Sequence, residues 1–259
     1  MFEVAEAYEE MMGRWSRLLA PLFVEFARVQ DGDVVLDVGC GTGSLASTLA
    51  RITRAAKIVA IDPSAAFIQA ARSQIIEPRV TVELGDAQNL SYPSASFDRC
   101  LALLIVNFIP DAPKAAKEMR RVTKPGGLVA TAMWDASPAN ELNHCLWIAA
   151  RELDPNVKRP ANMPGSYGSA EALSTLLADA GLSGIEVQDL SISCEFSSFE
   201  EHWRRYLTGE GPNGNYVLGL SEDRRAALKD KLRENLFGNR PDGPFTLKAK
   251  AWAVRGVVP

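Results

Sequence analysis

Residues 34–43 place one carboxylate directly before a loop rich in glycine. Asp37 lies within residues 34–38, an otherwise apolar run that is typical of a short, buried β-strand. Glycines then occupy alternate positions, where they let the backbone turn sharply and approach a ligand that a Cβ atom would obstruct. These glycines are Gly39, Gly41 and Gly43. A helix expected over residues 44–51 would point its N-terminal amides at the loop, so the segment predicts a strand, a ligand-binding loop and a helix.

Three interpretations of this loop compete. A plain strand-turn-helix corner is disfavoured by Asp37, because the carboxyl ends of strands in open α/β sheets bind ligands and an unpaired acid is costly there. A dinucleotide site requires the spacing G-x-G-x-x-G, whereas the third glycine of this chain comes one residue early. No basic residue flanks the loop to bind a pyrophosphate. The residues therefore favour a ligand that carries hydroxyl groups and a positive charge.

A second acid follows a second predicted strand, residues 57–62. Asp62 lies about 20 residues beyond the glycines, the spacing at which an acid in a nucleotide-binding βαβ unit accepts hydrogen bonds from ribose hydroxyls. The alternative is that Asp62 only caps the helix that starts near Pro63 and Ser64, since all three residue types occur at helix starts. We favour ribose binding because the position and the chemistry agree.

Further segments continue the alternation of strands and helices. Residues 79–84 predict a third strand, and Gly85, Asp86 and Ala87 follow it as a turn. Residues 93–98 read Pro-Ser-Ala-Ser-Phe-Asp and lead into residues 97–107, an apolar run that predicts a central strand buried on both faces. Residues 118–127 read Glu-Met-Arg-Arg-Val-Thr-Lys-Pro-Gly-Gly, where proline and glycine end a helix. Over about residues 31–135, the type and order of these segments resemble the class I S-adenosylmethionine-dependent methyltransferases, in particular methyltransferase type 11, the ubiquinone/menaquinone methyltransferase-like family.

The resemblance implies S-adenosyl-L-methionine as the cofactor and S-adenosyl-L-homocysteine as the product. It implies that Asp86 receives the adenine amino group, that the Ala87 amide donates to the ring, and that the backbone around Leu103 lies beside the methionine moiety. The cofactor contacts expected from residues and resemblance together are Asp37, Gly39, Cys40, Gly41, Gly43, Asp62, Pro63, Asp86, Ala87 and Leu103. Methyltransferases that act on amino groups of nucleic acids often carry Asp/Asn-Pro-Pro-Tyr/Phe near Leu103. This chain reads Leu-Leu-Ile-Val there, which disfavours those substrates.

The expected fold is an α/β, Rossmann-like, doubly wound sheet of seven mostly parallel strands with an antiparallel last strand. Further helices are expected over residues 111–123 and 169–180, and further strands over 128–134, 184–193 and 245–255. Residues 30–195 and 242–257 would form the methyltransferase domain. Residues 1–29 would form an N-terminal helical lid, and the insertions 137–168 and 196–241 would cover the substrate.

The N-terminal segment, residues 8–17, combines aromatic residues with arginines. Arg14 would suit the cofactor carboxylate through a bidentate contact, and an aromatic face such as that of Tyr8 would suit the sulfonium. The alternative is an amphipathic helix that packs on the core with its arginines in water. Both interpretations stay open at this point.

Methyl transfer from a sulfonium is a single in-line displacement, so positioning supplies most of the catalysis. A general base is needed only if the acceptor loses a proton during attack. Four residues in or beside the insertions are candidates for that role, although for each of them a structural role is favoured over a catalytic one. They are His144, His202, Asp135 and Tyr167. No metal site is expected, because Asp135 and Asn140 supply too few ligands.

The composition is that of an ordinary soluble enzyme, with 259 residues and a net charge of −4. We expect no nucleic-acid partner, because no basic face is visible, and no membrane span. An acidic N-terminus without a signal pattern and widely spaced cysteines, expected as free thiols, predict a cytoplasmic protein. Aromatic residues in the insertions favour a small, apolar acceptor. The alternative function is a non-catalytic S-adenosylmethionine-binding sensor or partner subunit; the oligomeric state stays open.

Overall fold

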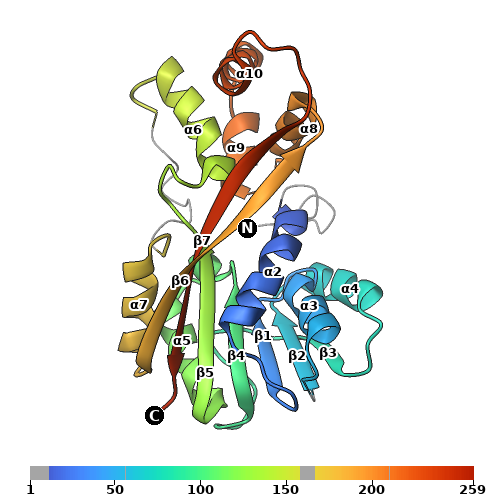
Figure 1. Ribbon diagram of the computed structural model, residues 1–259, viewed down its shortest axis with the longest axis vertical. Helices are drawn as coiled ribbons and strands as arrows, with labels where there is room; N and C mark the ends of the chain where they lie inside the picture. Colours follow the sequence, from blue (N-terminus) through green and yellow to red (C-terminus); the bar gives the residue numbers. More distant parts are fainter. Residues whose placement is uncertain (1–11, 56, 158–166, 210) are drawn as a thin grey trace.

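The computed structural model describes residues 12–55, 57–157, 167–209 and 211–259. Its strands form one sheet, some of its helices lie on the two faces of that sheet, and others form a lobe beyond one end of it (Figure 1). The strands are β1 (Val34–Val38), β2 (Lys57–Asp62), β3 (Val80–Leu84), β4 (Phe97–Leu103), β5 (Thr123–Trp134), β6 (Ser183–Phe196) and β7 (Phe245–Val257). The helices are α2 (Arg14–Phe26), α3 (Ser44–Ile52), α4 (Ala65–Gln74), α5 (Ala112–Val122), α6 (Glu141–Leu153), α7 (Ala170–Asp179), α8 (Phe199–Arg204), α9 (Gly211–Leu218) and α10 (Glu222–Phe237), with 3₁₀ turns η2 (Val106–Phe108) and η3 (Arg205–Thr208).

The seven strands lie in the order β3-β2-β1-β4-β5-β7-β6. All neighbours from β3 to β5 are parallel, and β7 runs antiparallel to both β5 and β6. This arrangement confirms the predicted doubly wound sheet with an antiparallel last strand. The chain reverses its direction of winding between β1 and β4, and ligands of open α/β sheets bind at the carboxyl ends of strands beside such a reversal.

The sheet divides the buried apolar side chains into two clusters. One cluster contains Phe23 of α2 and Leu49 of α3. These two helices lie in front of the sheet in Figure 1. The other contains Met119 of α5 and Leu173 of α7. Helices therefore cover both faces, which explains why the central strands are apolar almost without interruption.

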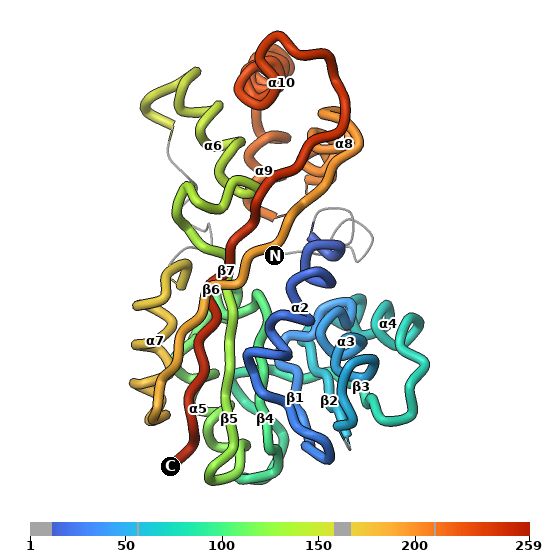
Figure 2. The backbone as a smooth tube through the Cα atoms, viewed as in Figure 1, coloured from blue at the N-terminus to red at the C-terminus, as the bar shows by residue number. Residues whose placement is uncertain are grey.

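A helical lobe formed by α6, α8, α9 and α10 stands above the carboxyl ends of the parallel strands (Figure 1). β6 and β7 pair from Ser183 to Phe196 and rise together from the sheet into this lobe, as Figure 2 shows. α6 belongs to the predicted insertion 137–168, and α8 to α10 belong to the insertion 196–241. β6 extends beyond the expected end at residue 193, because its ladder with β7 continues to the pair Phe196–Phe245.

Two other boundaries differ from the prediction. The apolar run 97–107 is not one strand: β4 ends at Leu103, because Leu104 adopts a left-handed conformation with φ of 61°, and η2 follows. β5 begins at Thr123, not at residue 128, and its register against β4 shifts between Phe97 and Arg99. A Cβ atom at Gly127 would lie 2.8 Å from the Asp98 carbonyl oxygen, so close packing favours glycine at this position.

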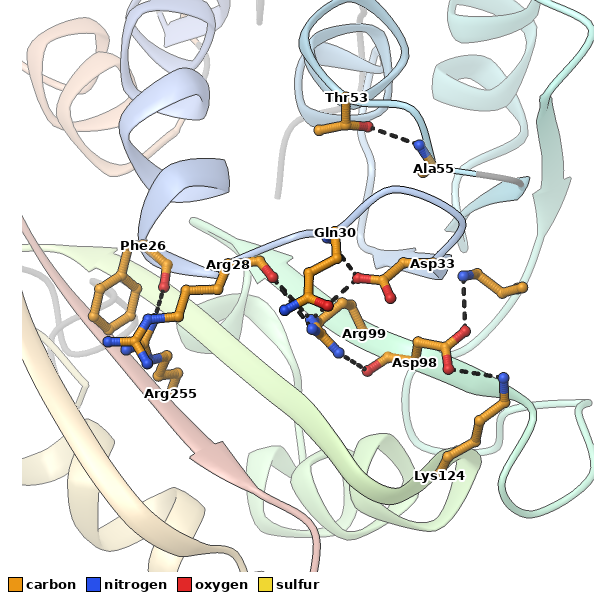
Figure 3. Close-up of polar contacts among 11 residues, drawn as sticks. Phe26, Arg28, Gln30, Asp33, Thr53, Ala55, Asp98, Arg99, Lys124 and Arg255 are labelled. Carbon is orange, nitrogen blue, oxygen red and sulfur yellow. Dashed lines mark hydrogen bonds and ion pairs between the residues drawn. The ribbon is translucent and has the colours of Figure 1, made fainter.

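Polar contacts fix the opposite edge of the sheet, where β1 begins (Figure 3). Asp98 accepts hydrogen bonds from the Val34 amide at 2.9 Å and from Lys124 Nζ at 2.8 Å. Arg99 pairs with Asp33 at 3.3 Å and also donates to the carbonyl oxygen of Arg28. These contacts join the end of α2 to the sheet far from the carboxyl edge.

The four cysteines are free and buried, as predicted. In the described ranges, the structure contains no helix with the length and apolar character needed to cross a bilayer.

Candidate functional site

A cavity of about 270 Å³ opens at the carboxyl edge of the sheet, beside the winding reversal. It gathers residues that follow four different strands and that are far apart in the sequence. Predicted site residues in its lining are Gly39, Gly41, Asp62, Pro63, Asp86, Ala87 and Leu103. The remaining lining residues are Ser64, Phe67, Gly85, Gln88, Leu104, Ile105, Phe108, Ile109 and Pro110.

The glycine loop forms one wall of this cavity. Its three glycines have positive φ angles of 73°, 54° and 94°, which other residues rarely adopt. A Cβ atom on Gly39 would lie 2.4 Å from Ile105 Cγ1, and one on Gly43 would lie 2.5 Å from Ile75 Cδ1. The loop is therefore limited to glycine by conformation at all three positions and by packing at the outer two.

Asp62 links the loop to the start of α4. Its Oδ2 accepts a hydrogen bond from the Gly41 amide at 3.0 Å, and its Oδ1 accepts one from the Ser64 amide at 2.9 Å. Ser64, and not Asp62, is the N-cap of α4, through a contact with the Phe67 amide. Each carboxylate oxygen keeps a second acceptor site, and the side chain lines the cavity. Burial raises the pKa of Asp62 above its ordinary value, although the two amides oppose this effect.

Asp37 lies beneath the loop, inside β1, and is only 1% exposed. The amide of Ala46 in α3 donates a hydrogen bond to it, while Oδ2 has no hydrogen-bond partner in the described structure. Burial raises the pKa of Asp37 to about 8, and the nearby charge of Asp62 adds to the shift. A buried carboxylate with an unused oxygen suits a ligand with a positive charge, because it lacks a cation from the protein.

Asp86 and Ala87 follow β3 at the far side of the cavity. Asp86 is exposed and accepts hydrogen bonds from the amide and the side chain of Gln88. Gln88 in turn accepts a hydrogen bond from the Asp111 amide at 3.0 Å, so it connects this turn to the start of α5. The turn therefore presents a carboxylate that remains open to solvent.

Residues 36–131 match a family model described as "Methyltransferase domain". The methyltransferase GfsG of Streptomyces halstedii is 33% identical over 174 residues, which are 63% of this chain and 57% of GfsG. Nocamycin O-methyltransferase of Saccharothrix syringae is 25% identical over 94% of this chain and 91% of its own. A Haemonchus contortus phosphoethanolamine N-methyltransferase 2, solved with phosphomonomethylethanolamine and S-adenosylhomocysteine, has a TM-score of 0.58 at 19% identity, over 98% of this chain and 57% of that one.

Residues 36–131 thus form a methyltransferase domain, similar to those of the class I S-adenosylmethionine-dependent methyltransferases. This assignment agrees with the family resemblance of the sequence, and S-adenosylmethionine is the cofactor of the class. The residues of the methyltransferase fit that cofactor. Gly39 and Gly41 of the loop line the cavity, and Asp37 beneath the loop has an unused buried oxygen.

Several predicted residues of the methyltransferase do not line the cavity. Asp37, Cys40 and Gly43 lie outside the lining. Burial raises the pKa of the Cys40 thiol far above its ordinary value. Arg14 pairs with Glu201 of α8, and its guanidinium carbon lies 3.9 Å from the centroid of Trp15. Tyr8 lies outside the described residues.

Asp135, His144 and Tyr167 are not among the residues that line this cavity. Asp135 accepts hydrogen bonds from the amide and the hydroxyl of Ser137, both at 2.8 Å. A ring nitrogen of His144 lies 2.6 Å from the carbonyl oxygen of Ala136, so both side chains hold the turn before α6. Tyr167 lines a separate hollow beside α7.

His202 lies buried inside the helical lobe. Its Nε2 is 3.6 Å from Cys145 Sγ and 3.2 Å from the Tyr206 hydroxyl. Burial lowers the pKa of His202 well below its ordinary value, and the charges of Arg205 and Arg14 lower it further. The ring is therefore neutral near pH 7.

The apolar part of the cavity lining was not predicted from the sequence. Ile105, Phe108 and Ile109 follow β4 and face the glycine loop or the cavity. The apolar run 97–107 gave no sign that the strand ends at Leu103 and that the remaining residues turn across the site.

Proposed function

We propose that this protein transfers the methyl group of S-adenosylmethionine to a small, mainly apolar organic acceptor. The cavity at the carboxyl edge supports the proposal, because it brings the glycine loop, Asp62 and Asp86 together. The bound cofactor would supply a methyl group on a positively charged sulfur.

Each polar group at the edge suits one part of the cofactor. The free acceptor sites of Asp62 suit the ribose hydroxyls, and Asp86 with the Ala87 amide suits the adenine ring. The open loop and the backbone at Leu103 suit the methionine moiety. Asp37 acts from beneath the loop, through its charge.

The chain itself would contribute position and the exclusion of water. Leu104, Ile105 and Phe108 make the lining largely apolar, which keeps water away from the reacting atoms. Because none of the candidate bases lines this cavity, we propose that catalysis depends on orientation and not on a general base beside the cofactor.

The acceptor is proposed to be a small molecule of the cytoplasm. The net charge of −4 gives no support to a nucleic-acid substrate. The helical lobe buries Trp147, Phe199, Trp203 and Tyr206, which favours an apolar acceptor beneath it. One relative that aligns over most of both chains is named an O-methyltransferase, so we favour oxygen as the acceptor atom.

The proposal is tested with S-adenosylmethionine carrying a labelled methyl group, incubated with the protein and panels of phenols, quinols and carboxylic acids. We expect label in at least one organic product and one equivalent of S-adenosylhomocysteine for each methyl transferred. Cofactor binding without label transfer to any panel or to cell extract would contradict the catalytic proposal and favour a non-catalytic sensor or partner subunit.

A further inference from the structure

Arg205 is a buried cation with no counterion among the residues that the structure describes. It is the first residue of η3, directly after α8, and its side chain is only 2% exposed. Its Nε, Nη1 and Nη2 atoms make no hydrogen bond to any part of the chain that the structure describes. Its guanidinium carbon lies 5.1 Å from the ring centroid of Tyr206. Since a guanidinium stays protonated in proteins, the positive charge is permanent.

Four elements meet around this charge. Arg205 acts electrostatically on Cys145 of α6, Cys194 of β6 and His202 of α8. Arg14 of α2 acts on the latter two groups, so both arginines face the same region. Arg14 is compensated by its ion pair with Glu201. In contrast, the described residues provide no ion pair for Arg205, and one positive charge remains unbalanced.

An unpaired buried charge is strongly unfavourable, and proteins normally bury arginine only with a partner. The surrounding groups do not remove the cost. His202 is held neutral by its low pKa, and its Nδ1 also lacks a hydrogen-bond partner within the described ranges. The described residues therefore leave a place for an anionic partner beside Arg205.

We propose that Arg205 binds a carboxylate group of the methyl acceptor inside the helical lobe. The inference rests on the proposed function and gives its substrate a chemical class, an organic acid. A carboxylate carries the single negative charge that is missing, and its two oxygens match the fork of a guanidinium. A phosphate dianion would exceed the available charge, because Glu201 already neutralises Arg14.

The position of the lobe agrees with this role. It stands above the same edge of the sheet that holds the cofactor cavity (Figure 1). Phe196 lies on β6 beside this region, with its ring centroid 4.7 Å from that of His202 and 4.8 Å from the Arg14 guanidinium carbon. The residues around the proposed carboxylate site are therefore largely aromatic, which suits the apolar body of an organic acid.

The test uses the full chain saturated with S-adenosylhomocysteine, and titrates benzoate, hexanoate and decanoate in a calorimeter. Benzamide, hexanamide and decanamide are the neutral matches. The variants are Arg205→Met, Arg205→Lys and Arg204→Met. Arg204 is the matched control, because it is the preceding residue and is exposed.

We expect at least one acid, and not its amide, to bind the wild type and Arg204→Met. Arg205→Met should weaken that binding by a factor of about 10 to 100, and Arg205→Lys by less, because a lysine keeps the charge but not the fork. Without ligand, Arg205→Met should unfold at the same or a higher temperature than the wild type, because it removes an unpaired buried charge.

Three results would overturn the inference: no binding of any acid, equal binding of an acid and its amide, or unchanged acid binding by Arg205→Met. A lower unfolding temperature for ligand-free Arg205→Met than for Arg204→Met would also overturn it, by showing that Arg205 is satisfied within the folded chain. Failure of the wild type to bind S-adenosylhomocysteine is a separate result, which concerns the cofactor cavity alone.

Discussion

Asp37 and Asp62 lie at the same edge of the sheet but differ in their surroundings and hydrogen bonds. Asp62 keeps free acceptor sites toward the cavity and also holds the amides of Gly41 and Ser64. The ribose and helix-start interpretations of Asp62 are therefore compatible, because one carboxylate has enough lone pairs for both. Asp37 is buried beneath the loop, where its pKa of about 8 leaves it mostly protonated at pH 7 in the absence of a cation.

This raised pKa predicts the pH dependence of stability. Between the ordinary pKa of 3.8 and a value of about 8, folded Asp37 keeps a proton that the unfolded chain loses. Its contribution to the free energy of unfolding therefore falls as the pH rises through that window, by up to about 1.4 kcal/mol for each unit. Asp37→Asn cannot titrate, so urea unfolding at pH 5.5 and 7.5 should show a smaller loss than in the wild type.

The measurement is made without ligand, because a bound cation would favour the ionised form. Identical losses of stability in the wild type and Asp37→Asn would show that Asp37 does not keep its proton in the folded protein.

At the scale of elements, the parallel strands and their acids could be predicted from residue types alone. Short apolar runs that end at Asp37, Asp62 and Gly85 coincide with β1, β2 and β3. These signals are local, because each strand and the turn after it lie together in the sequence. The same local signals predicted several residues that line the cavity, among them Gly39, Asp62 and Ala87.

Contacts between distant segments could not be predicted in this way. Ile105 packs where a Cβ atom of Gly39 would lie, although 66 positions separate the two residues in the numbering. Arg14 pairs with Glu201, which belongs to the second insertion. α2 also buries Leu19 and Phe23 completely, so the described part of the N-terminal segment packs as a core helix. A covering role for residues 1–29 stays a prediction.

The close approach of Gly39, which follows β1, to Ile105, which follows β4, predicts that Gly39 tolerates no side chain. Gly39→Ala should lower the free energy of unfolding through two effects. The strain of a positive φ costs about 1–2 kcal/mol, and overpacking against Ile105 costs a further amount of about 1–3 kcal/mol. Gly32→Ala is the matched control, since Gly32 has a φ of 84° but open space around its Cβ position. Urea unfolding of both variants separates the two contributions.

If Gly39→Ala and Gly32→Ala lose the same stability, Ile105 moves aside at little cost and the loop is less tightly packed than the structure indicates.

At the scale of the whole molecule, the two edges of the sheet differ in character. The edge where β1 begins is joined by charged contacts of Asp98 and Arg99 (Figure 3). The opposite edge leaves Oδ2 of Asp37 without a hydrogen-bond partner and carries the helical lobe with Arg205, for which the described residues provide no partner. Unused polar groups concentrate on one side, which is the side where the fold binds ligands.

The central claim is that the carboxyl edge binds S-adenosylmethionine through Asp62. Calorimetric titration of S-adenosylhomocysteine into the wild type, Asp62→Asn and Asp98→Asn tests it most directly. Asp98 is the control, because it also holds a backbone amide but lies at the opposite edge. We expect the dissociation constant to rise by a factor of about 10 to 100 for Asp62→Asn, through loss of charged hydrogen bonds to the ribose, and to stay unchanged for Asp98→Asn. Wild-type affinity in Asp62→Asn, or an equal loss in Asp98→Asn, would contradict the account.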